Sequence, residues 1–255
     1  MKVIKVKNIN IGEGKPKICV PVIGNSISVI AQNAKAAGES IADIVEWRCD
    51  YFDGVFDKNR ALEALEVVSN NIGEKPLLCT FRSSNEGGEQ AITSEKYIEL
   101  YVILMQTGLV DMVDVELFAG DELVEAIIAK AKEYNVKVII SNHDFDKTPG
   151  DEDIRNRLIK MQSLGGDIAK IAVMPKNNAD VLRLMSITRS TKDECMNIPV
   201  ITMSMAAKGV ISRISGEIFG SDVTFGAVTD ISAPGQININ VLSGILDTIH
   251  SGNED

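Results

Sequence analysis

Two polar side chains stand out in the apolar stretch between residues 136 and 174. The run VKVIISNH ends at His143, one of two histidines in the chain, and the run DIAKIAVM contains Lys170. Burying a lysine as a cation is costly, and burial favours the neutral amine, which attacks ketones and aldehydes to form a Schiff base. A histidine close by can act as the general base. These residue types therefore predict imine chemistry at Lys170 with proton transfer by His143.

Each of these residues also has a structural explanation. Lys170 can be a structural lysine that pairs with a nearby carboxylate, and His143 can be a core or loop histidine with satisfied hydrogen bonds. Taken together, the two favour chemistry. Consecutive parallel strands are usually neighbours, so their C-terminal ends would face the same pocket.

A repeated alternation of strand-like and helix-like segments positions these residues. In a chain of 255 residues, eight apolar strand-like runs each precede a helical segment. Eight such units predict an all-parallel (β/α)₈ barrel, which typically needs about 250 residues and so fits a single domain over residues 1–255. An open doubly wound sheet is the alternative, but no glycine-rich phosphate-binding motif follows the first strand. The runs are 18–23, 43–52, 76–82, 109–118, 136–143, 167–174, 199–205 and 221–228.

Residues 2–12 precede this series and alternate apolar and polar side chains. The alternation predicts a short β-hairpin with one wet face, which we expect to close the bottom of the barrel.

The barrel predicts that functional residues lie at the C-terminal ends of the strands. The polar residues in and directly after the strand-like runs fall at these ends. Because side chains alternate along a strand, Lys170 shares one face with Ile168 and Ala172, and chemistry requires that this face point into the barrel. The candidates are Glu46 and Arg48 after the second strand, Arg82 and Glu86 after the third, Asp114 and Glu116 on the fourth, His143, Lys170, Met203, Met205 and Arg213.

The charged candidates suggest distinct uses. Arg48, Arg82 and Arg213 at one mouth can hold a carboxylate, and Glu86 can orient the second ring nitrogen of His143. A solvated ring of ion pairs is the alternative for the residues of the second and third strands. The segment SAPGQ resembles the start of a helix, with Ser232 as the candidate N-cap. The free backbone N–H groups of such a helix start can bind an anion; the alternative is that Ser232 is an ordinary cap.

A metal site is not predicted. Asp114 and Glu116 can ligate a cation, but only one histidine lies nearby in the predicted barrel and no further carboxylate cluster accompanies them. The four cysteines are widely spread without a CxxC motif, so we expect reduced thiols.

The overall charge and the hydropathy argue against a nucleic-acid-binding protein and against a membrane protein. A net charge of −10 argues against non-specific nucleic-acid binding, although a local arginine cluster can still attract an anionic substrate. No segment has the length of a membrane span, and the N-terminal segment lacks the apolar core of a signal peptide. We therefore expect a cytoplasmic protein that contacts neither nucleic acid nor membrane.

The motifs together resemble the type I 3-dehydroquinate dehydratases, the Schiff-base-forming lyases of the shikimate pathway. The resemblance covers nearly the whole chain in the expected order, with no departure at a motif position. Its most specific parts are VDVEL at 113–117 and VIISNHD at 138–144. It also rests on EWR at 46–48, FRSSNEGG at 81–88, AKIAVMP at 169–175, TMSM at 202–205, SRISGEIFGS at 212–221 and ISAPGQ at 231–236.

This resemblance implies a barrel enzyme of aromatic amino acid biosynthesis that removes water from 3-dehydroquinate to give 3-dehydroshikimate. It implies a homodimer that uses no metal or organic cofactor. It also implies an imine at Lys170, general acid and base catalysis by His143, and support of His143 by Glu86. The implied substrate-binding residues are Glu46, Arg48, Arg82, Met203, Met205, Arg213, Phe225, Ser232, Ala233 and Gln236.

Two other function classes remain open from the sequence. A class I aldolase would share Lys170 but cleave a carbon–carbon bond, and assay with dehydroquinate separates the two enzymes. A catalytically inactive binding barrel is the non-enzymatic alternative, and the complete set of Lys170, His143 and Arg213 argues against it.

Overall fold

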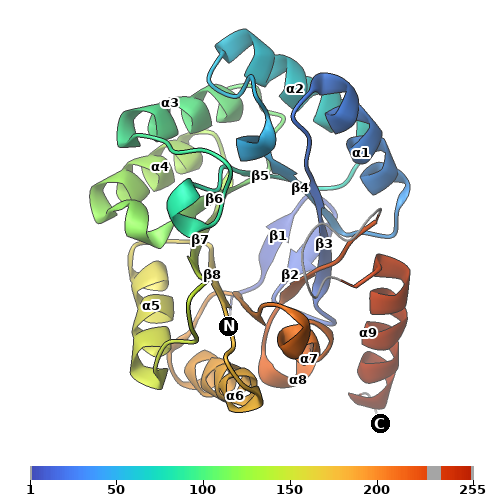
Figure 1. Cartoon of the computed structure of the whole chain (residues 1–255), viewed down its shortest axis with the longest axis vertical. Coiled ribbons are helices and arrows are strands. Elements are labelled where there is room, and N and C mark those ends of the chain that lie inside the picture. The colour runs from blue at the N-terminus through green and yellow to red at the C-terminus, as the bar shows by residue number, and fades with distance from the viewer. Residues whose placement is uncertain (1, 229–236, 254–255) are drawn as a thin grey trace.

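Eight parallel strands form a barrel in the computed structural model, which describes residues 2–228 and 237–253. The strand order is β10-β3-β4-β5-β6-β7-β8-β9, so each strand from β3 to β8 pairs with the next along the chain and β10 pairs with β3. This confirms the predicted (β/α)₈ barrel and excludes the open doubly wound sheet (Figure 1). The strands are β3 (Lys17–Val22), β4 (Ile44–Arg48), β5 (Leu77–Thr80), β6 (Met112–Glu116), β7 (Lys137–Asp144), β8 (Ile168–Val173), β9 (Val200–Ser204) and β10 (Val223–Phe225).

The seam between β9 and β10 is held partly by side chains. The Asp222 N–H donates to the Val200 carbonyl at 2.7 Å, and the Thr202 N–H donates to the Ser221 hydroxyl at 3.1 Å. The Asp222 carboxylate also accepts the Val200 N–H at 2.8 Å. These contacts close the barrel where the short strand β10 offers few backbone partners.

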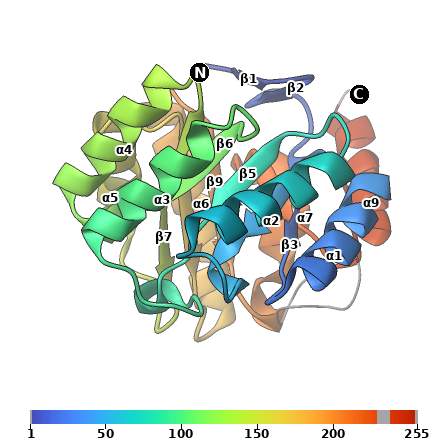
Figure 2. The ribbon, with the colours of Figure 1, turned by 90° about the horizontal axis from the view of Figure 1, so that it is seen from above.

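Helices surround the barrel, as Figures 1 and 2 show. Side-chain caps begin several of them: Asp57 accepts the N–H groups of Asn59 and Arg60, and Asn177 accepts that of Asp180. The seventh unit differs from the others, because two short helices replace one long one. The helices are α1 (Ile27–Glu39), α2 (Lys58–Asn71), α3 (Ser94–Met105), α4 (Asp121–Glu133), α5 (Asp151–Ser163), α6 (Asn178–Cys195), α7 (Val210–Ile214), α8 (Gly216–Phe219) and α9 (Ile239–Asn253).

Strand β8 shows how the two layers of the core share one strand. Ala169, Ile171 and Val173 belong to the large cluster between the sheet and the helices. Ile168 and Ala172 belong to the smaller cluster inside the barrel. The alternation therefore directs the intervening Lys170 into the barrel, as predicted.

The N-terminal hairpin consists of β1 (Ile4–Val6) and β2 (Ile9–Ile11), paired antiparallel. Its apolar side chains Ile4, Val6 and Ile11 are buried in the same cluster as the barrel-interior residues of the strands. Figure 2 shows the hairpin across one end of the barrel. The hairpin thus closes the bottom and leaves the opposite end for the polar residues.

The described residues also bear on two expectations about the chain. All four cysteines are free thiols, and Cys19, Cys49 and Cys79 are buried. Within residues 2–228 and 237–253, no helix combines the length and the hydropathy needed to cross a membrane.

Candidate active site

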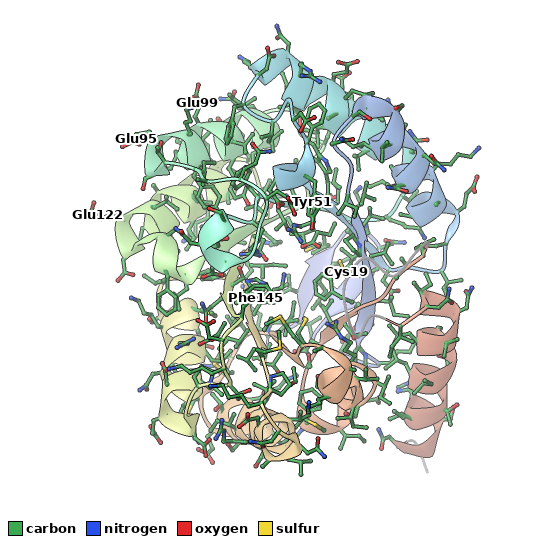
Figure 3. All side chains as sticks on the ribbon, in the orientation of Figure 1. Cys19, Tyr51, Glu95, Glu99, Glu122 and Phe145 are labelled. Atoms are coloured by element: carbon green, nitrogen blue, oxygen red, sulfur yellow. The ribbon has the colours of Figure 1, made fainter. Side chains whose placement is uncertain are left out.

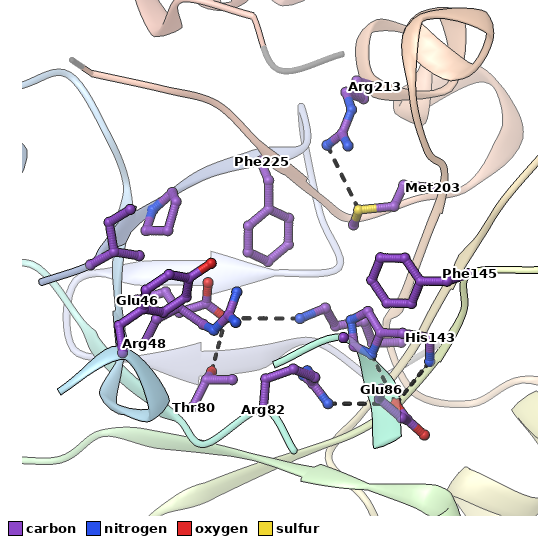
Figure 4. A pocket seen from close by; sticks show the side chains of 15 residues that line it. Glu46, Arg48, Thr80, Arg82, Glu86, His143, Phe145, Met203, Arg213 and Phe225 are labelled. Atoms are coloured by element: carbon purple, nitrogen blue, oxygen red, sulfur yellow. Dashed lines mark hydrogen bonds and ion pairs between the residues drawn. The ribbon is translucent and has the colours of Figure 1, made fainter. Parts of the chain in front are cut away.

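A polar cavity of about 150 Å³ lies at the C-terminal ends of the barrel strands (Figure 4). Many acidic side chains that give the chain its negative charge lie elsewhere: Glu95, Glu99 and Glu122 are exposed at the outer edge of the helix layer (Figure 3). The cavity brings together nine of the residues predicted from the sequence: Glu46, Arg48, Arg82, Glu86, His143, Lys170, Met203, Arg213 and Phe225.

Four of the predicted substrate-binding residues are not part of this lining. Met205 is partly buried and packs against the apolar cluster inside the barrel. Ser232, Ala233 and Gln236 lie outside the residues that the structure describes.

Lys170 lies on β8 and is 4% exposed. Its Nζ atom is 3.0 Å from Asp114 Oδ2, 3.9 Å from Glu46 Oε1 and 4.7 Å from the centre of the Phe225 ring. The carboxylate pairing that the structural explanation predicts is therefore present, and Lys170 also lines the candidate pocket, as imine chemistry requires. A cationic iminium at the same nitrogen would keep the stabilisation by Asp114 and Glu46.

Asp114 connects Lys170 to a buried network. It accepts a hydrogen bond from Arg82 Nη2 at 2.6 Å and another from Ser141 Oγ at 2.5 Å. Burial by itself raises the pKa of Asp114, but Arg82 and Lys170 outweigh this effect and hold its pKa below the ordinary value. Asp114 is therefore a permanent anion beside the amine.

The same network occupies the carboxylates that were considered as metal ligands. Glu116 accepts Arg82 Nη1 at 3.0 Å and Ser83 Oγ at 2.6 Å. Among the described residues, no group of three or more histidine, cysteine or acidic side chains is placed to hold a metal ion. Asp114 thus pairs with Arg82 and Lys170, and Glu116 pairs with Arg82. That the enzyme needs no metal ion stays a prediction.

His143, at the end of β7, contacts Glu86 twice. Its Nδ1 lies 3.0 Å from Glu86 Oε2, and its backbone N–H donates to the same oxygen at 2.9 Å. Burial, with Arg82 and Lys170 nearby, lowers the pKa of His143 well below its ordinary value, so the ring is neutral at pH 7. An ionised Glu86 accepts a hydrogen bond from the Nδ1–H group, and Nε2 is then an unprotonated base.

The turn FRSSNEGG places Glu86 at this position. A short 3₁₀ helix, η2 (Ser84–Glu86), ends at Gly87, whose φ of +81° is readily adopted only by glycine. A Cβ atom at Gly87 would also overlap the ring of Phe145, which packs directly over it. Burial raises the pKa of Glu86 to about 7, although Arg82 at 3.6 Å opposes this rise.

The three arginines at the mouth differ in their partners. Arg48 donates twice to the buried Asp50, at 2.8 Å each, and Arg82 is engaged by Asp114 and Glu116. Arg213 is 6% exposed, and among the described residues its Nη1 contacts only Met203 Sδ, at 3.7 Å. Burial lowers the pKa of Arg213. Of the three arginines expected to hold a carboxylate, only Arg213 is left without a carboxylate partner in the part of the chain that the structure describes, and carboxylate binding by the set stays a prediction.

Several residues of this cavity and its surroundings were not predicted from the sequence. Asp50 could have been found from its position two residues after Arg48, and Asn142 from its position beside His143. The cavity is further lined by residues whose types and spacing did not indicate a catalytic or binding role: Pro21, Ile23, Tyr51, Thr80, Gly87 and Phe145.

Comparisons with known proteins agree with this geometry. A family model described as type I 3-dehydroquinase matches residues 18–253. A 3-dehydroquinate dehydratase of Listeria monocytogenes is 50% identical over 250 residues, covering 98% of this chain and 99% of that protein. One of Clostridium botulinum is 49% identical over 249 residues and 98% of both chains.

A solved structure gives the same result. The crystal structure of a type I 3-dehydroquinate dehydratase from Clostridium difficile, described as carrying covalently modified comenic acid, is 49% identical to this chain. It superposes with a TM-score of 0.96 over 98% of this chain and 99% of that one.

Proposed function

This chain belongs to the type I 3-dehydroquinate dehydratase family, a family of Schiff-base-forming hydro-lyases, and we propose that Lys170, His143 and Glu86 carry out its reaction. Membership in the family decides for the dehydratase over the aldolase and the inactive barrel considered from the sequence. One observation supports the residue assignment above all others. The buried amine of Lys170 and the neutral imidazole of His143 line the same cavity, and Glu86 contacts the far nitrogen of that imidazole.

The proposed reaction begins with an imine. The Lys170 amine adds to the ketone of 3-dehydroquinate, and the hydroxyl group so formed takes up a proton and leaves as water. The product is a protonated imine beside Asp114 and Glu46, whose proton is released again when the imine is hydrolysed at the end of the cycle. The iminium withdraws electrons from the adjacent C–H bond, which a neutral imidazole could not otherwise deprotonate. His143 then takes that proton, and the electron pair of the C–H bond forms a carbon–carbon double bond while the iminium nitrogen accepts the imine π electrons, which gives a neutral enamine.

Elimination and release complete the cycle. The enamine expels the β-hydroxyl group, to which His143 returns the proton, so that water departs. Because one residue serves both steps, the hydrogen and the hydroxyl leave from the same face of the ring. Hydrolysis of the remaining imine frees 3-dehydroshikimate and restores the Lys170 amine.

The substrate carboxylate is proposed to bind Arg213. A buried guanidinium without an anionic partner among the described residues is costly, and a bound carboxylate removes that cost. Glu46, Arg48 and Arg82 would contact substrate hydroxyls or neighbouring charges, while Met203 and Phe225 would form apolar walls. The substrate-binding roles of Met205, Ser232, Ala233 and Gln236 stay predictions.

Other statements also remain proposals. We propose one domain over residues 1–255, because the strands of one barrel run from Lys17 to Phe225 and α9 packs beside it. A homodimer, a cytoplasmic location and the absence of a metal or organic cofactor stay predictions.

Covalent trapping tests the central step. Borohydride added together with 3-dehydroquinate is expected to attach the reduced substrate or product to Lys170 and to no other lysine, because Lys170 is the lysine that lines the cavity. Peptide mass analysis after digestion would locate the label. Labelling of a different lysine, or no substrate-dependent label, would contradict the proposed mechanism.

Arg213→Met should separate binding from stability. We expect kcat/KM to fall by about 10²-fold or more, the size expected when one partner of a buried charge pair is removed. The melting temperature of the free enzyme should stay equal or rise, because the substitution removes a buried cation that no described carboxylate neutralises.

Arg82→Met is the matched comparison. It should lower the melting temperature, since it leaves Asp114 and Glu116 without their shared cation. If Arg213→Met destabilises the free enzyme as much as Arg82→Met does, Arg213 already has an anionic partner in the free enzyme and is not the unpaired cation proposed to bind the substrate carboxylate.

A further inference from the structure

Two residues outside the cavity connect Glu86 to the helix layer. Asn142 is 2% exposed and follows Ser141 on β7, so its side chain points away from the barrel interior that Ser141 and His143 face. Its Nδ2 donates to Glu86 Oε1 at 3.1 Å. Its Oδ1 accepts a hydrogen bond from Arg157 Nη1, on α5, at 2.7 Å.

Arg157 determines which way the Asn142 amide faces. A guanidinium has donors only, so the atom of Asn142 that contacts Arg157 must be the carbonyl oxygen. The NH₂ group of the amide is then directed at Glu86. Without Arg157, the amide could rotate by half a turn and present its oxygen to Glu86, which would repel a carboxylate.

Arg157 itself is held in place from several sides. Asp153, one helical turn earlier, accepts two hydrogen bonds from it at 2.7 and 3.0 Å, and the Asp144 carboxylate lies 3.8 Å away. The Phe118 ring stacks 5.2 Å from its guanidinium carbon. The Arg157 side chain is only 13% exposed, although the Asp153 side chain is 52% exposed.

From these contacts we infer that Arg157, acting through Asn142, is a positioning residue that keeps Glu86 an ionised acceptor for the Nδ1–H group of His143. An ionised Glu86 leaves Nε2 of His143 unprotonated toward the substrate. A protonated Glu86 would instead donate to Nδ1 and place the ring proton on Nε2, where it blocks the general base.

The charges around Glu86 support this direction. Burial raises its pKa to about 7, and the neighbouring Glu116 raises it too, whereas Arg82, Asn142 and the His143 N–H lower it. Loss of the Asn142 donor removes one lowering effect, so the pKa of Glu86 must rise. The active, ionised form would then need a higher pH.

The pH dependence of kcat/KM tests this inference. Arg157→Met should move the acidic limb upward by roughly one pH unit, a tenfold change in the ratio of protonated to ionised Glu86. The variant should therefore be about tenfold slower than wild type at pH 6 and nearly equal at pH 9. Arg155→Met is the matched control, because Arg155 lies on the same helix but pairs with Glu194, and it should leave the limb in place.

A second variant keeps the test decisive if Arg157→Met fails to fold. Asn142→Ala removes the donor itself and should move the limb in the same direction. If Arg157→Met and Asn142→Ala lower activity equally at every pH, the two residues act on structure alone and the inference is wrong.

The inference rests on the proposed role of Glu86, which Glu86→Gln tests separately. Glutamine does not titrate, so this variant should lose the acidic limb, and adding Arg157→Met to it should move nothing further. If Glu86→Gln keeps the wild-type limb, the proposed role of Glu86 fails. If it loses the limb while Arg157→Met alone leaves it unmoved, only the role of Arg157 fails.

Discussion

Lys170→Ala is expected to abolish both turnover and borohydride trapping. Without the amine no iminium forms, so no electron sink activates the C–H bond. Removal of a covalent nucleophile typically lowers kcat on the order of 10⁶-fold. Substrate binding should largely persist, because the proposed anchor of the carboxylate is Arg213. Stopped assays with high enzyme concentration, mass spectrometry and calorimetric titration with 3-dehydroquinate would measure the three effects.

Two further variants make this result specific. Lys170→Met fills the space beside Phe225 and should behave like the alanine variant, which excludes a cavity as the cause. Lys192→Met removes another shielded lysine that is paired with a carboxylate, Asp222, at 2.7 Å, but lies outside the cavity lining. This variant should keep borohydride trapping at Lys170. Turnover by Lys170→Ala within a few-fold of wild type would overturn the assignment.

His143→Ala should uncouple the imine from the elimination. Addition of an amine to a ketone needs less help from the histidine than removal of a proton from carbon does, so borohydride trapping at Lys170 should persist, although more slowly. Turnover should fall by at least the roughly 10²- to 10⁴-fold that loss of a general base causes, and by more if His143 also assists dehydration and imine hydrolysis. Single-turnover kinetics with trapping at successive times would separate the steps.

The second histidine provides the control for this experiment. His250 also contacts a carboxylate through Nδ1, that of Glu217, but it lies on α9 away from the cavity lining. His250→Ala should therefore keep wild-type elimination. If His143→Ala also keeps it, His143 is not the base, and Glu86 becomes the next candidate.

The sequence predicted the barrel because its determinants are local. Strand and helix periodicity, the glycine-containing turns and the alternation along β8 each depend on a few consecutive residues. The closed architecture then follows from eight repeats, and the placement of Lys170, His143 and Glu86 at one end follows from the parallel direction of the strands. The N-terminal hairpin was predictable for the same reason.

Which charges pair with which was decided by the tertiary structure. The sequence grouped Arg48, Arg82 and Arg213 as one carboxylate clamp, whereas the structure pairs the first two with buried carboxylates. It also left open whether Lys170 is a structural lysine paired with a carboxylate or an imine-forming amine; the structure shows the pair and places the nitrogen at the pocket, and imine formation stays a proposal. These outcomes depend on distances of a few ångströms between strand ends that are tens of residues apart in the chain, and no local pattern encodes such distances.

The barrel, the end of it that carries the polar residues, and the family to which the motifs belong could all be predicted from local sequence patterns. The three-dimensional arrangement was needed to show that Asp114 is the partner of Lys170, that Arg213 lacks a carboxylate among the described residues, and that Arg157 reaches Glu86 through Asn142. The physical reason is that backbone periodicity is set by neighbours along the chain, whereas electrostatic and hydrogen-bond partners are set by neighbours in space.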